Sequence, residues 1–120
     1  MSVTANKVLS ILNELFPANP HRRIFPEYYV KYKGNRLFFD FFIKELGVFI
    51  EVQGRQHVQF VKHFHGDAET FHKQKMRDNL KIEYVQEFSQ CLVRIYDTEK
   101  VTKALVKKKI FKALEECFYE

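Results

Sequence analysis

The 120-residue sequence contains only two cysteines and no apolar run close to the roughly 20 residues that span a membrane. Two cysteines are too few for a disulfide framework, so Cys91 and Cys117 are expected to be reduced, buried thiols. The first residues lack the basic stretch and apolar core of a secretory signal, which favours an intracellular, cytoplasmic protein. Repeats, low-complexity tracts and linkers are also lacking, so residues 1–120 are expected to form one domain.

The composition favours a packed core and a polyanionic partner. Hydrophobic residues make up 46% of the chain, including 13 Phe, which argues against disorder. The net charge is +5, and such a basic excess favours binding to a polyanion. The basic residues occur on both sides of the central acidic residues: Arg22, Arg23, Lys31, Lys33, Arg36, Arg55, Lys62, Lys73, Lys75, Arg77 and Lys107 to Lys109.

Two runs of aromatic and β-branched residues predict neighbouring buried strands, at 37–43 and 48–53. Gly47 lies in the short connection between them, so we expect a hairpin turn at 44–47. Side chains alternate between the two faces of a strand, so Glu51 and Gln53 should share one face. The hairpin would bring Asp40 next to Glu51.

Two carboxylates that converge on one face of a buried sheet need compensation for their charge. An isolated ionised carboxylate is very costly to bury, so a shared cation is one interpretation of Asp40 and Glu51. The alternative is structural, with Asp40 facing water or forming an ion pair with a nearby basic residue. The nearby basic residues are Arg36, Lys44 and Arg55.

The remaining pattern predicts a mixed β-sheet flanked by helices, a fold of the α/β or α+β class. Strand Cys91–Tyr96 should run parallel to strand 48–53, because a helix lies between them in the sequence. The other expected elements are a helix from a Thr4 cap to about Phe16, a connecting region at 21–35 with a short strand near 28–31, a helix from an Asp67 cap to Glu87 with Asp78 on its inner side, and a helix at 101–118.

Four motifs in this order resemble the PD-(D/E)xK nuclease superfamily. They are Asp40, then Glu51-Val-Gln-Gly-Arg-Gln-His57, then Lys75-Met-Arg-Asp78-Asn-Leu-Lys81, and then the strand 92–95. Within the superfamily the chain is similar to the branch of the very short patch repair (Vsr-like) endonuclease and the phage EDxHD homing endonucleases. The resemblance implies a restriction-endonuclease-like core and a metal-dependent DNA endonuclease, with a phage or mobile-element origin suggested.

The same resemblance implies a metal site. Asp40 and Glu51 would be metal ligands, with the carbonyl oxygen of Val52 completing the protein ligands. Hard oxygen ligands of this kind imply Mg²⁺ or Mn²⁺.

The resemblance also implies roles in proton transfer. Gln53 stands where many superfamily members have lysine, so another residue must accept the proton. His57 is the candidate general base, because an imidazole titrates near neutral pH. Asp78 would orient the imidazole and stabilise its protonated form.

A glutamate on the first helix is usual in this branch, and the sequence offers Glu14 for that place. Alignment of the helix start puts Lys7 there instead, so the choice between them stays open. The basic residues expected to bind DNA are Arg55, Lys75, Arg77 and Lys81.

Two other functions are compatible with the sequence. The chain could be a nuclease-fold module that binds nucleic acid without turnover, or a subunit that belongs to a larger nuclease. A single domain of 120 residues leaves little room for a separate sequence-reading element. Recognition of a long DNA site would therefore need a homodimer, a partner chain or a fused specificity domain.

Overall fold

The computed structural model describes residues 1–54 and 68–118. Together these residues form a mixed four-stranded sheet with three flanking helices, as expected for an α+β fold. The elements are α1 (Val3–Leu15), β1 (Ile24–Tyr32), β2 (Asn35–Ile43), β3 (Val48–Gln53), α3 (Ala68–Glu87), β4 (Cys91–Tyr96) and α4 (Lys103–Phe118).

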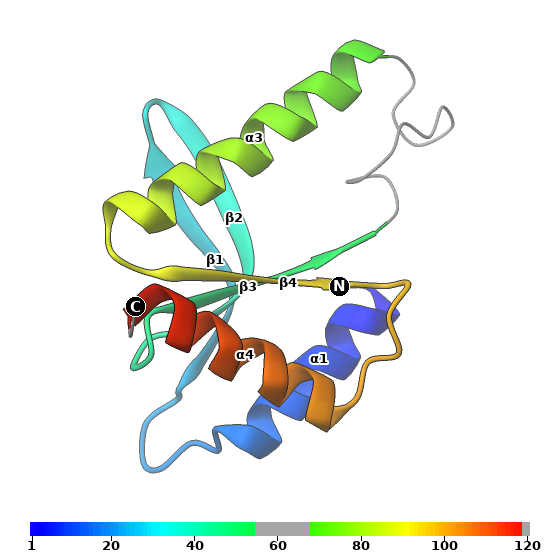
Figure 1. Cartoon of the computed structure of the whole chain (residues 1–120), viewed down its shortest axis with the longest axis vertical. Helices are drawn as coiled ribbons and strands as arrows, with labels where there is room; N and C mark the ends of the chain where they lie inside the picture. The colour runs from blue at the N-terminus through cyan, green and yellow to red at the C-terminus, as the bar shows by residue number, and fades with distance from the viewer. Residues whose placement is uncertain (55–67, 119–120) are drawn as a thin grey trace.

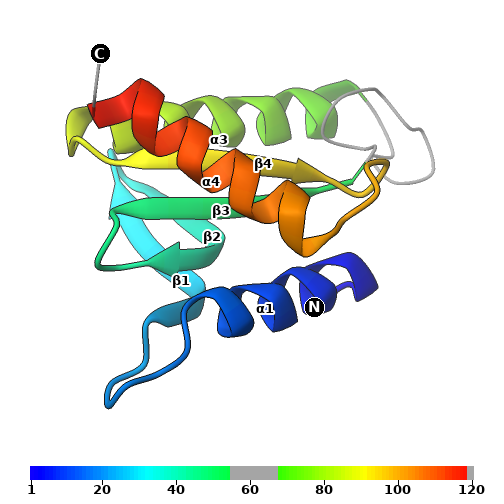
Figure 2. The same ribbon diagram turned by 60° about the horizontal axis from the view of Figure 1, so that its bottom comes forward.

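The strand order in the sheet is β1-β2-β3-β4. Strand β2 is antiparallel to both of its neighbours, β1 and β3. Strand β3 pairs with β4 in parallel, as expected for two strands with a helix between them in the sequence. Helix α3 covers one face of the sheet, and α1 and α4 lie together on the other (Figure 1). The same arrangement is visible when the molecule is turned (Figure 2).

Each face of the sheet has its own hydrophobic core. On the face of α1 and α4, the alternate residues Val48, Ile50 and Val52 of β3 pack with residues of both helices. On the face of α3, Phe49 lies at the centre of an aromatic cluster. The alternation in β3 therefore holds as expected, and Glu51 and Gln53 belong to the α3 face.

Both hairpin turns use backbone with positive φ. Gly47 has a φ of 65° in the turn between β2 and β3, where the sequence predicts it. Lys33 and Gly34 have φ values of 48° and 76° at the tip of the β1–β2 hairpin. Two successive positive φ values suit the twist of a two-residue hairpin, and glycine adopts such values without steric cost.

Strand β1 is longer than the short strand predicted near 28–31. It covers Ile24–Tyr32 and pairs with β2 from Ile24–Ile43 to Tyr32–Asn35. The sequence of β1 mixes buried and exposed positions without a long apolar run, and its pairing partner defines its length.

The helix starts also differ from the expected ones. Helix α1 begins at Val3 with Ser2 as its cap, because the Ser2 side chain accepts a hydrogen bond of 3.0 Å from the Ala5 amide. Thr4 therefore lies inside the helix. Helix α4 begins at Lys103, where the Thr102 hydroxyl accepts from the Leu105 amide at 3.1 Å. The expected Asp67 cap lies outside the described residues.

The expectation of two reduced thiols is wrong. Cys91 and Cys117 form a disulfide that joins the start of β4 to the end of α4, with a Cα–Cα distance of 6.3 Å. The two residues are 26 positions apart, and only the packing of α4 against β4 brings them together. Within the described residues, no helix is both long and apolar enough to cross a membrane.

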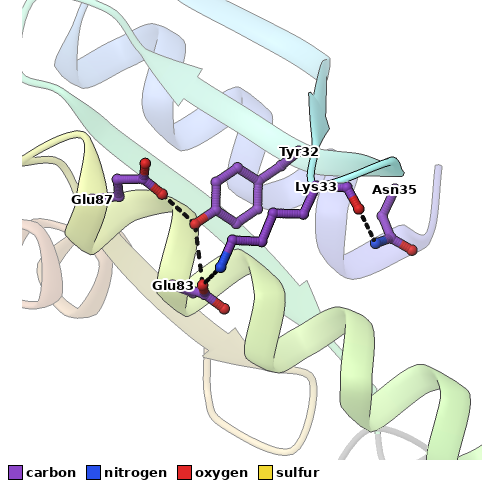
Figure 3. A network of polar contacts seen from close by, with 5 residues as sticks. All are labelled: Tyr32, Lys33, Asn35, Glu83 and Glu87. Carbon is purple, nitrogen blue, oxygen red and sulfur yellow. Dashed lines mark hydrogen bonds and ion pairs between the residues drawn. The ribbon is translucent and has the colours of Figure 1, made fainter.

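A polar network holds the tip of the β1–β2 hairpin on α3 (Figure 3). The buried Tyr32 hydroxyl donates to Glu87 and, at 3.3 Å, to Glu83, while Lys33 forms an ion pair with Glu83. The hydrogen bond to Glu87 contributes most to a raised pKa of Tyr32, so the phenol stays protonated as the donor. The network attaches the hairpin to the C-terminal half of α3.

Candidate functional site

Asp40 lies where β2 separates from β3. In the described part of the chain, β3 pairs with β2 only from Phe41–Ile50 to Ile43–Val48. Beyond this point Asp40 Oδ2 accepts a hydrogen bond of 2.7 Å from the Val52 amide. The carboxylate therefore replaces a backbone acceptor that β2 would otherwise supply, and it ties the end of β3 to β2.

Odd-numbered residues of β2 switch from one face of the sheet to the other at Asp40. Leu37 and Phe39 pack toward α3, whereas Phe41 and Ile43 pack toward α1 and α4. Across the ladder from Asp40, Glu27 of β1 has a positive φ of 51°; it lies between Pro26 and Tyr28, which pair with Phe41 and Phe39. This local irregularity lets the Asp40 side chain approach β3.

Glu51 is a buried acid with a buried counterion. Its side chain is 6% exposed, and Oε1 accepts a hydrogen bond of 3.0 Å from the Lys81 ammonium of α3, which is 12% exposed. Burial raises the pKa of Glu51 to about 7, Lys81 opposes this shift, and the nearby charges of Asp40 and Asp78 add to it. One lysine therefore does not fully compensate the ionised carboxylate.

Asp78 and Gln53 are buried on the same side of the sheet, at 7% and 3% exposure. Asp78 belongs to the inner side of α3, as its position in the sequence predicts. The Nε2 amide of Gln53 has no hydrogen-bond partner among residues 1–54 and 68–118. A buried donor without an acceptor is costly, so Gln53 is suited to donate to a bound oxygen.

Arg94 of β4 is a site residue for which the sequence suggested no role. It is the register partner of Glu51, and its Nη2 donates to the backbone oxygen of Asp78 at 3.3 Å. Within the part of the chain that the structure describes, its buried Nε has no hydrogen-bond partner. Alternation along Cys91–Tyr96 places Arg94 on the face opposite Val93 and Ile95, which is the signal that could have identified it.

An open cleft of about 640 Å³ lies between the β1–β2 hairpin and α3 and reaches Asp78 of this cluster. Asp78 and Lys81 lie along its wall on α3, and β2 forms the opposite wall. Arg36 and Arg77 also line it, and neither forms an ion pair with a residue in the described ranges 1–54 and 68–118. The cleft therefore brings the basic residues Arg36, Arg77 and Lys81 together with the buried acid Asp78, whose charge acts on Glu51.

The structure separates the basic residues expected to bind DNA. Arg77 is exposed and Lys75 is half-buried on α3, whereas Lys81 points to Glu51 instead of toward solvent. Arg55 and His57 lie outside the described residues, so their expected roles stay predictions.

The first helix brings no acid to the cluster. Glu14 and Lys7 are both exposed on α1, which packs against the face opposite α3. Neither side chain forms an ion pair within the part of the chain that the structure describes. Because both side chains are exposed on the same helix, the structure favours neither Glu14 nor Lys7 for the helix-glutamate position of the family.

The donor set of the cluster suits a hard cation, although it is small. Asp40 and Glu51 contribute carboxylate oxygens, and Val52, next to the last residue of β3, offers a carbonyl oxygen. Among residues 1–54 and 68–118, no group of three or more His, Cys, Asp or Glu side chains is arranged to hold a metal ion. Comparison with family models, curated proteins and solved structures found no match to this chain.

Proposed function

We propose that this protein is a metal-dependent DNA endonuclease with a restriction-endonuclease-like core, which hydrolyses phosphodiester bonds. The observation that supports this most is the burial of Glu51 beside Asp40 and Asp78, with one lysine as its counterion. Clustered acids with a perturbed pKa, one of which (Asp78) lines a basic cleft, are typical of a catalytic site. A fold core alone would be more stable with apolar residues at these positions.

The oxygen ligands of Asp40 and Glu51, with the Val52 carbonyl, fit Mg²⁺ or Mn²⁺. When bound there, the cation would supply positive charge that stabilises the transition state of phosphodiester hydrolysis and would activate water. Lys81 holds the Glu51 carboxylate in position through their 3.0 Å hydrogen bond. The Gln53 amide would donate to an oxygen of the scissile phosphate.

His57 is the proposed general base, and it would accept a proton from water on a ring nitrogen. Its proposed partner is Asp78, which would hold the imidazolium by its charge. Gln53 cannot take this role, because an amide does not accept a proton near neutral pH.

A second function is favoured by one observation. Lys81 already neutralises much of the Glu51 charge without a metal, so the cluster could serve in a nucleic-acid-binding module that has no turnover. This alternative predicts binding of DNA without any metal-dependent cleavage. It also covers a role as the binding subunit of a larger nuclease.

Cleavage of supercoiled plasmid with and without Mg²⁺ tests the proposal. The wild-type protein should nick or linearise the plasmid only with metal. Asp40→Asn and Glu51→Gln should each reduce the rate by about 100-fold or more, because each removes a charged ligand. Asp40→Asn keeps an acceptor for the Val52 amide, so the fold should persist.

The matched control is Glu115→Gln, which neutralises an exposed acid on α4. Its cleavage rate should equal that of the wild type. Undiminished cleavage by Asp40→Asn would exclude the proposed site, and metal-independent DNA binding without cleavage would favour the binding module.

A further inference from the structure

The outer face of the β1–β2 hairpin combines exposed aromatic and cationic side chains. Tyr29 and Phe38 are 46% and 56% exposed, although large aromatic side chains are usually buried. They are register partners, and their ring centroids are 5.1 Å apart. Their neighbours on β1 and β2, Lys31 and Arg36, are the next pair on the same face and are exposed as well.

The charge pattern of this face points to an anionic partner. Lys31 and Arg36 are directly opposite each other across the two strands, and like charges in this position destabilise a sheet. Neither of them forms an ion pair with any of the described residues. The nearby acids Glu83 and Glu87 are instead bound to Lys33 and Tyr32. A polyanion on the outer face would relieve the repulsion.

The outer face is continuous with the cleft that leads to the acidic cluster. Arg36 and Phe38 belong to both, because they also line the cleft together with Arg77 of α3. The path therefore combines the exposed aromatic residues of the hairpin with Arg36, Arg77 and the acid Asp78, which line the cleft. Exposed rings beside cations are what unpaired nucleotides need, since their bases can stack and their phosphates can pair.

We propose that the outer face of the β1–β2 hairpin, formed by Tyr29, Lys31, Arg36 and Phe38, binds a single-stranded segment of nucleic acid and directs it into the cleft. This inference rests on the proposed function and adds its substrate class: unpaired nucleotides beside the scissile bond. A base stacks on Phe38, and the adjoining phosphate contacts Arg36. A duplex offers its phosphates to the same cations but keeps its bases away from the rings.

Binding is measured by fluorescence anisotropy with a short labelled oligonucleotide of mixed sequence, as single-stranded DNA, single-stranded RNA and DNA duplex. The full chain is used in EDTA, so that turnover cannot occur. The wild type should bind at least one of the single strands more tightly than the duplex. Phe38→Ser should weaken single-strand binding by roughly 5- to 100-fold, the effect of losing one stacked base. Phe38→Tyr should retain it.

The matched controls lie on other surfaces. Phe111→Ser removes a ring that is 54% exposed on α4, and Arg22→Gln removes an exposed arginine before β1. Both should bind single strands as the wild type does. Thermal unfolding of each variant checks that the fold is unchanged.

The salt dependence separates stacking from charge. Arg36→Gln should reduce the slope of log K against log salt by about 0.7, the value for one phosphate contact on a single strand. Phe38→Ser should leave this slope unchanged, because a ring neutralises no phosphate.

Three results would overturn the inference. They are tighter binding of duplex than of either single strand, equal single-strand binding by Phe38→Ser and wild type, and a wild-type dimer that becomes monomeric in Phe38→Ser, which would make the outer face a contact between two copies. The plasmid assay distinguishes the two proposals. Loss of single-strand binding in Phe38→Ser with no cleavage by the wild type would leave this surface standing and reject the nuclease. Normal cleavage by the wild type, together with unchanged single-strand binding by Phe38→Ser, would reject this surface and leave the nuclease proposal standing.

Discussion

At the scale of single residues, Glu51 gives the clearest link between packing and chemistry. Its carboxylate is buried beside two other acids, and Lys81 is its hydrogen-bonded counterion. Burial raises its pKa from 4.5 to about 7, so the folded protein retains a proton that the unfolded chain releases. The acid is therefore a source of instability near neutral pH, as is typical of the perturbed acids found in catalytic sites.

The stability of the protein should consequently fall as pH rises from about 4.5 to 7 and then level off, because the folded state binds more protons than the unfolded state in this window. The contribution of Glu51 to this fall should be about 3 kcal/mol. Urea unfolding of wild type and Glu51→Gln at pH 4.5 and pH 8 measures it. The free-energy difference between the two proteins should shift in favour of the variant at pH 8, while Glu115→Gln shows no such shift. An equal difference at both pH values would contradict the raised pKa.

At the scale of secondary-structure elements, α3 depends on the aromatic cluster beneath it. Its fully buried residues are Asp78 and Val85, so its own apolar surface is small. Phe49 of β3 is 1% exposed and contacts rings from β2 and α3, with centroid distances of 4.2 Å to Phe42 and 5.9 Å to Tyr84. The ring therefore joins the sheet to the helix that contributes Asp78 and Lys81.

Phe49→Ala should lower the free energy of unfolding by about 3–5 kcal/mol, the usual cost of removing a buried ring. Phe111→Ala, which removes an exposed ring from α4, should change it by less than about 0.5 kcal/mol. Denaturant unfolding measures both values. Hydrogen exchange should also show earlier loss of protection in α3 than in α4, and a uniform loss across the molecule would argue against this role of Phe49.

At the scale of the whole molecule, the sheet separates an apolar core covered by two helices from the face that carries the proposed catalytic residues. On one face, α1 and α4 cover an apolar core, and a disulfide joins the end of α4 to β4. On the other face lie the acids, Lys81, Arg94 and the basic cleft. A ligand bound on the α3 face would therefore connect β2, β3 and α3 and stabilise the fold as a unit.

Mg²⁺ or Mn²⁺ should raise the melting temperature of the wild-type protein at pH 8, because a cation that binds only the folded state stabilises it by mass action. A metal concentration 100 times the dissociation constant corresponds to about 2.7 kcal/mol. Asp40→Asn and Glu51→Gln should show no increase beyond that produced by NaCl at matched ionic strength. Equal shifts in wild type and both variants would place metal binding elsewhere in the molecule.

Much of the fold and part of the site follow from local pattern. The bounds of β3 and β4, the turn at Gly47 and the inner side of α3 depend on periodicity and on turn residues within a few positions of each other. For the same reason the sequence alone predicts that Glu51 and Gln53 share a face.

Tertiary structure alone decided the rest. Strand β1 acquires its length from its pairing with β2, and the disulfide forms because α4 packs on β4. Lys81, expected to contact DNA, instead pairs with Glu51 because α3 crosses the sheet above β3. The disulfide joins residues 26 positions apart and the Lys81–Glu51 ion pair joins residues 30 positions apart. Local sequence does not determine which of many possible partners each of these residues contacts.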